Sequence, residues 1–196
     1  MKKILLFSAL FLIPSLLIST NAQYKKNEIE LGVGIFNFNE IINITSDVII
    51  SSVPTGTTME NSSSYGSVHA AYKYRIRERI GVGGLFAFDY STAEAMRYDI
   101  KIGDFKKRHY TLAAEADFIY LNFDRFKMYA LAGVGATLYG LTYTSAINGE
   151  KDNNTTPYFT FQVTPIGIRY GERFGGFLEV GFGYRGILNA GIFVRL

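Results

Sequence analysis

The end of the chain, Leu178–Leu196, alternates between apolar side chains and small or polar ones. The apolar set is Leu178, Val180, Phe182 and Tyr184, followed by Leu188, Ala190, Ile192, Val194 and Leu196. Glycine or polar residues fill the positions between them, with Phe193 as the exception. A period of two is typical of β-strands with one apolar face. In a soluble sheet that face forms the core, whereas in a transmembrane barrel it meets lipid and the polar face lines the lumen.

The beginning of the chain has the layout of a secretory signal peptide. Two lysines precede an apolar stretch from Ile4 to Ile18, and small residues lead to a cleavage site after Ala22. The stretch is shorter than the roughly 20 residues that a membrane-spanning helix needs, and Pro14 interrupts it. We therefore predict that residues 1–22 are a cleaved signal peptide and that residues 23–196 form one exported domain.

The composition favours strands and leaves little room for several function classes. The chain has 16 Phe, 14 Tyr and 20 Gly, which are strand formers and close-packing residues. It has no cysteine, so disulfides and thiolate chemistry are excluded. Cleavage would remove two of the 20 basic residues and none of the 17 acidic ones, which leaves 18 against 17. This near-neutral balance does not indicate nucleic-acid binding.

The pattern along residues 23–196 predicts eight strands of about 9 to 13 residues each, the length that a tilted strand needs to cross a bilayer. Three long polar connections, 37–63, 91–108 and 144–157, alternate with short turns. In outer-membrane barrels the long loops face outside and the short turns face the periplasm. The alternation changes sides at Pro165, which predicts a β-bulge there. The strand at about 127–143 is apolar on both faces, so the pattern does not assign its sides.

Three segments carry a resemblance to a known family: YALAGVG (Tyr129–Gly135), TPIGIRYG (Thr164–Gly171) and the terminal stretch Phe177–Leu196. With the signal peptide, they make the chain similar to the small barrels of the OmpA/OmpX-like superfamily. The resemblance implies an all-β, eight-stranded antiparallel up-and-down transmembrane β-barrel in the cell outer membrane. It also implies contact with outer-membrane lipid and recognition by the barrel-assembly machinery. One departure is the last residue, which is Leu196 where the family usually has an aromatic side chain.

The polar face of the predicted strands places charged residues in the lumen. The set consists of Lys73, Arg75, Glu115, Asp117, Glu179, Arg185 and Arg195, with Arg169 added if the predicted bulge is present. About eight strands enclose a space that side chains can fill, so these charges must pair with one another or stay hydrated. We interpret them as a structural plug, and a gate for ions is the alternative.

The function that these features favour is a non-enzymatic outer-membrane protein with a structural role or with surface contact through loops 37–63, 91–108 and 144–157. The alternatives are a narrow gated ion channel, a lipid-modifying enzyme and a soluble lipocalin-type binder. His69 has no adjacent acid or hydroxyl, and His109 with Thr111 is a weak match to a catalytic pair. A lipocalin-type barrel would expose aromatic residues to water. We therefore predict no catalytic residue, metal ligand or cofactor.

Overall fold

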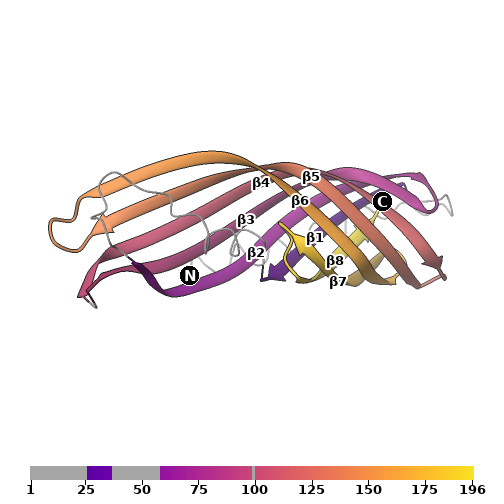
Figure 1. Ribbon diagram of the computed structural model, residues 1–196. Helices are drawn as coiled ribbons and strands as arrows, with labels where there is room; N and C mark the ends of the chain where they lie inside the picture. Colours follow the sequence, from indigo (N-terminus) through magenta and orange to yellow (C-terminus); the bar gives the residue numbers. More distant parts are fainter. Residues whose placement is uncertain (1–25, 37–57, 99) are drawn as a thin grey trace, which may run out of the picture.

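The described residues form one closed antiparallel barrel in which the strands follow one another in chain order (Figure 1). The computed structural model describes residues 26–36, 58–98 and 100–196. Its strands are β1 (Asn27–Ile35), β2 (Thr58–Arg77), β3 (Ile80–Arg97), β4 (Ile100–Asn122), β5 (Phe126–Ser145), β6 (Lys151–Gly171), β7 (Phe174–Gly183) and β8 (Leu188–Arg195). Pairing of β8 with β1 closes the ring, so the predicted eight-stranded up-and-down fold is confirmed. The predicted signal peptide, residues 1–22, lies outside the described residues.

The strands differ in length far more than the sequence pattern predicts. β1, β7 and β8 have 8 to 10 residues, within or just below the expected range. By contrast, β2 to β6 have 18 to 23 residues. Figure 1 shows these longer strands continuing past the ends of β1, β7 and β8 at one end of the barrel. The segments 58–64, 90–97, 100–108, 140–145 and 151–155 make up this extension, which we call the projecting sheet.

The prediction of three long loops was wrong for most of the described residues in these segments, which form strands. Residues 91–108 form a hairpin in which β3 ends at Arg97 and β4 begins at Ile100. Residues 144–157 form a second hairpin with a short turn after Ser145. Within 37–63, residues 58–63 belong to β2, and residues 37–57 lie outside the described part of the chain. The polar composition of these segments suggested loops. The strands lie beyond the lipid-facing apolar band, so their outer face does not need to be apolar.

The register resolves two points that the sequence left open or conditional. On β5, Tyr129, Leu131 and Thr137 are buried while the even-numbered residues between them are half-buried or exposed, so the odd-numbered side chains face the lumen. On β6, the pairing with β7 shifts between Val163 and Ile166, which confirms the bulge predicted at Pro165. This shift turns the even-numbered residues after it outward and the odd-numbered ones inward.

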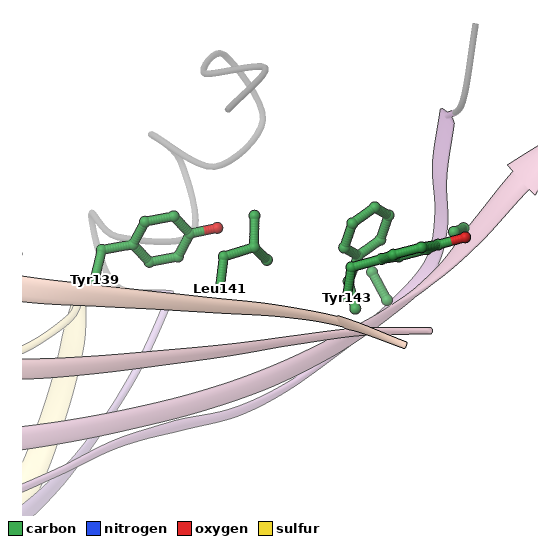
Figure 2. Packing of buried hydrophobic residues seen from close by; sticks show 6 residues of the cluster. Tyr139, Leu141 and Tyr143 are labelled. Carbon is green, nitrogen blue, oxygen red and sulfur yellow. The ribbon is translucent and has the colours of Figure 1, made fainter. Parts of the chain in front are cut away.

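An apolar cluster lines the inner face of the projecting sheet. It contains Ala93, Ala95, Phe105, Tyr139, Leu141 and Tyr143. Figure 2 shows Tyr139, Leu141 and Tyr143 rising from the same face of β5, as alternate residues of a strand must. The Tyr143 hydroxyl donates a hydrogen bond to the carbonyl oxygen of Ile102 at 3.1 Å. The cluster therefore ties the two projecting hairpins to each other.

Candidate functional site

Ionised side chains fill the interior at the end of the barrel with the short turns. The structure places all of the predicted lumenal residues there, each 9% exposed or less: Lys73, Arg75, Glu115, Asp117, Arg169, Glu179, Arg185 and Arg195. The cross-strand register explains why they converge. Lys73 and Gly83 are partners on β2 and β3, and Gly83 is in turn the partner of Glu115 on β4. A glycine between two long side chains leaves the lumenal space for their charged ends.

β1 contributes two carboxylates that the sequence-based set did not include. Glu28 and Glu30 are 1% and 0% exposed, and both point into the lumen. The pattern that could have identified them is present in the sequence, because Ile29 and Leu31 alternate with these glutamates. With them, the lumenal ion pairs of the described residues join an equal number of cations and carboxylates. The cations are Lys73, Arg75, Arg169, Arg185 and Arg195, and the carboxylates are Glu28, Glu30, Glu115, Asp117 and Glu179.

The first half of this network is built around Asp117 and Glu28. Arg75 donates to both oxygens of Asp117, at 2.5 and 3.1 Å, and Arg169 donates to the same carboxylate at 3.0 Å. Glu28 accepts hydrogen bonds from Arg75 at 3.2 Å and from Arg195 at 2.6 Å. Arg169 also lies 3.4 Å from Glu28. Each of the two carboxylates therefore has at least two guanidinium partners, as a buried charge requires.

The second half is built around Arg185, which follows the end of β7. Its guanidinium donates to Glu115 at 2.8 and 2.5 Å and to Glu179 at 3.1 Å. It also lies 3.4 Å from Glu30, which Lys73 contacts at 2.9 Å and Arg169 contacts as well. Glu30 thus connects the two halves, and the network runs across the lumen without a break.

Neutral side chains complete the hydrogen bonds of the network. Tyr129 donates to Glu179 at 2.5 Å, and the guanidinium carbon of Arg169 lies 3.7 Å from the centre of the Tyr129 ring. Tyr184 donates to Glu115 at 2.9 Å. The sequence pattern grouped Tyr184 with the lipid-facing residues, and this prediction was wrong. β7 ends at Gly183, where φ is 141°, so the backbone turns and the next side chain enters the lumen.

The histidines do not form a catalytic group with a hydroxyl or carboxyl in the described part of the chain. Neither ring nitrogen of His69 has a hydrogen-bond partner there. The His109 ring stacks on Tyr139 with 4.9 Å between ring centres, and the Thr111 hydroxyl is paired with that of Thr137 at 2.7 Å. Among the described residues, no group of three His, Cys, Asp or Glu side chains is placed to hold a metal ion.

The outer surface has the opposite character to the interior. Large apolar side chains are exposed around the barrel wall, including Val33 at 57%, Leu112 at 66% and Val134 at 56%. Exposed Tyr72, Tyr74, Phe118 and Tyr120 lie toward the short turns, and Tyr65 and Tyr110 lie toward the projecting sheet. A closed barrel with charges inside, an apolar band outside and aromatic residues at both borders is an integral outer-membrane β-barrel protein. The short turns mark the periplasmic end and the projecting sheet the extracellular end.

Among the residues that the structure describes, no helix is long and apolar enough to cross a membrane.

Comparisons with known proteins find similarity in overall shape and none in sequence family. No family model matches the chain, and no curated protein matches it. Two solved structures similar to it are of Ail, the attachment invasion locus protein of Yersinia pestis. The structure with the heparin analogue sucrose octasulfate has 13% sequence identity and a TM-score of 0.46, and the alignment covers 86% of this chain and 94% of that one. The structure of Ail by itself has 12% identity and a TM-score of 0.45, with the same coverage.

Proposed function

We propose that this protein is a non-enzymatic outer-membrane barrel that contacts a partner at the cell surface through its projecting sheet. The observation that carries the proposal is the sheet itself, which raises two hairpins beyond a barrel whose lumen is filled with ion pairs. The outer wall of the barrel contacts lipid, and the charged network fills its interior. The projecting sheet is the described part that remains available to a partner outside the cell.

The tips of the hairpins have the exposed apolar side chains that a contact surface needs. Tyr98 is 85% exposed, Ile100 is 66% exposed and Ile147 is 86% exposed. Apolar residues that leave water when a partner binds contribute most of the energy of small interfaces. In the rest of the wall, such residues are in the lipid-facing band.

The edge of the projecting sheet offers a second mode of contact. Residues 151–160 of β6 pair with β5 on one side, and the pairing of β6 with β7 starts only at Gln162. Within the described residues, this stretch has no strand on its other side. A free edge presents unpaired N–H and C=O groups that can bind an extended peptide as an added strand.

Shortening both hairpins tests this function. The register allows β3 and β4 to be joined by a two-residue turn after Ala93 and before Phe105, and β5 and β6 after Tyr143 and before Asp152. We expect the shortened protein to fold and insert, because the lipid-facing wall and the lumenal ion pairs are unchanged. Bacteria that display it should lose adhesion to a surface coated with plasma proteins, while bacteria with the full-length protein adhere.

Variants with one shortened hairpin serve as matched controls and show which hairpin makes the contact. Folding is checked by migration in SDS gels before and after boiling. Equal adhesion of the full-length and doubly shortened proteins would exclude contact through the hairpin tips and assign it to the β6 edge, of which the shortened protein keeps residues 152–160. Full-length protein that adheres no better than cells without it would contradict the proposal.

A further inference from the structure

Two cations on the outer face of β4 have no partner in the described structure. Lys106 and Arg108 are exposed, and as residues two apart on a strand they point the same way, about 7 Å from each other. Neither side chain makes a hydrogen bond or ion pair with any described residue. Their outward cross-strand neighbours are uncharged: Thr92 and Thr142 beside Lys106, and Tyr90 and Gly140 beside Arg108.

The nearest carboxylates on this face are already engaged. Lys101 pairs with Glu94 at 2.7 Å and with Asp104 at 2.8 Å, near the tip of the hairpin. The two free cations lie on the membrane side of that group. They are therefore available to an anion that comes from outside the protein.

Their height in the membrane identifies the kind of anion. The next outward residue on β4 is Tyr110, whose ring lies 5.1 Å from that of Phe88 on β3. Aromatic residues of this kind mark the border between hydrocarbon and headgroups. Lys106 and Arg108 lie directly beyond this border on the extracellular side, which is the level of outer-leaflet headgroups.

Below the aromatic pair, the same face has a shallow, open apolar groove of about 640 Å³. Gly84 and Ala114 are cross-strand partners that form its floor. Its sides are formed by Tyr72, Phe86, Leu112 and Val134. The barrel does not require a glycine at position 84, since an added Cβ would meet nothing closer than the carbonyl oxygen of Ala113 at 3.7 Å.

We propose that the outer face of β2–β5 binds one phosphorylated, acylated glycolipid of the outer leaflet. Lys106 and Arg108 bind its phosphate, and one acyl chain fills the groove over Gly84 and Ala114. Six residues separate Arg108 from Ala114, which is about 20 Å along a strand. Because strands are tilted, this corresponds to roughly the 15 Å of hydrocarbon in one leaflet. Basic residues at a membrane surface attract anionic headgroups, and the groove adds apolar contact.

Native mass spectrometry of the refolded protein in detergent micelles tests this site. The probes are bisphosphorylated hexa-acyl lipid A, the same lipid after removal of its phosphates, and phosphatidylglycerol. The variants are Lys106→Gln with Arg108→Gln, and Gly84→Leu, which fills the groove. The matched controls are Arg77→Gln with Arg79→Gln, two exposed cations at the periplasmic end, and Gly176→Leu, where an added Cβ meets only the Gly191 carbonyl oxygen at 3.5 Å.

We expect one bisphosphorylated lipid to be retained by the wild type and by both controls. The double glutamine variant and Gly84→Leu should each retain it about tenfold less, and the dephosphorylated lipid and phosphatidylglycerol should bind weakly. Every variant is first shown to fold by its migration in unboiled SDS gels. Equal retention by all variants, or equal retention with and without phosphate, would overturn the proposal. A dimer that Gly84→Leu abolishes would also overturn it, because the occupant would then be a second copy of the chain.

Discussion

Arg185 shows how one side chain can join parts of the barrel that are far apart in sequence. It follows the end of β7, yet its guanidinium contacts Glu115 on β4, Glu179 on β7 and Glu30 on β1. A buried cation and its carboxylate partners are stable together, because each charge is compensated by the others. Removing the cation leaves carboxylates without compensation in the lumen.

We expect Arg185→Met to destabilise the refolded barrel by about 3–5 kcal/mol, the usual cost of removing one partner of a buried pair. The measurement is reversible urea unfolding in lipid vesicles, with the slope checked for two-state behaviour. Arg185→Met combined with Glu115→Gln should recover part of the loss, because it removes one uncompensated charge. An unchanged urea midpoint for Arg185→Met would show that water already compensates these carboxylates.

A second residue-scale prediction concerns the tip of the β3–β4 hairpin, outside the membrane. Hydrogen bonds from Lys101 and Asn61 hold the pKa of Glu94 below its ordinary value of 4.5. Because the folded pKa is lowered, this contact stabilises the tip above that pH and is lost as the pH falls through the folded pKa. We expect Lys101→Gln to raise the pKa of Glu94 toward 4.5, measured by NMR titration of the side-chain carboxyl carbon. An unchanged pKa would assign the shift to Asn61.

The alternation of apolar and polar residues was sufficient to predict most lumenal side chains. It did not predict the direction of a side chain where the backbone turns at the end of a strand. Lys73, Arg75 and Asp117 follow the strict period of two and lie inside, as expected. Glu28 and Glu30 follow it too, since they alternate with Ile29 and Leu31 and lie inside, although the predicted lumenal set did not contain them. Tyr184 breaks the period because the strand ends one residue before it. No period of two can predict that.

At the scale of elements, β6 shows how a glycine accommodates an aromatic side chain across the strand pair. Gly167 is the cross-strand partner of Tyr129, and the Tyr129 ring lies over it, where an added Cβ would overlap the ring. In this position the tyrosine contacts Arg169 and donates to Glu179. Glycine at position 167 therefore leaves room for the Tyr129 ring, which in turn contacts the ion-pair network.

We expect Gly167→Val to displace the Tyr129 ring and to destabilise the barrel by about 1–3 kcal/mol, the usual effect of overpacking. The readouts are the urea midpoint in vesicles and loss of the near-ultraviolet circular dichroism of the buried tyrosine. Gly176→Val is the control, since its Cβ would meet only the Gly191 carbonyl oxygen, at an ordinary contact distance of 3.5 Å. If both variants behave alike, the effect of Gly167→Val comes from the strand backbone and not from Tyr129.

The elements also show why composition misled the prediction of loops. In the β3–β4 hairpin, Ala93 and Ala95 face inward while Thr92 and Glu94 are half-buried on the other face. The alternation is there, but neither face is strongly apolar, so the segment resembled a solvated connection. Its strands are stabilised by pairing with β2 and β5 and by the inner aromatic cluster, which no local pattern reveals.

At the scale of the whole molecule, the position of the boundary between lipid and water on the barrel wall can be measured. Val180 lies in the apolar band at 42% exposed, whereas Thr155 is on the outer face of the projecting sheet. We expect Val180→Arg to cost about 2–4 kcal/mol in bilayers and Thr155→Arg to cost less than about 1 kcal/mol. Unfolding titrations in vesicles provide both values. Equal costs would place the boundary elsewhere on the barrel.

The filled lumen leads to the last prediction, which separates a plug from a gate. The ion pairs cross the interior without a break, and the buried rings of Tyr129, Tyr184 and Phe193 contact Arg169, Glu115 and Arg195 of this network. We expect purified protein in a planar bilayer to show no steady current above that of the lipid alone, because no continuous water path remains. A barrel with Lys73→Met, Arg75→Met, Glu115→Gln and Asp117→Asn should fold less stably and still not conduct, since Arg169 and Arg185 keep blocking the lumen. Single-channel current steps in the wild type, with a size or ion selectivity that changes in this variant, would contradict the interpretation as a plug and favour a gated channel.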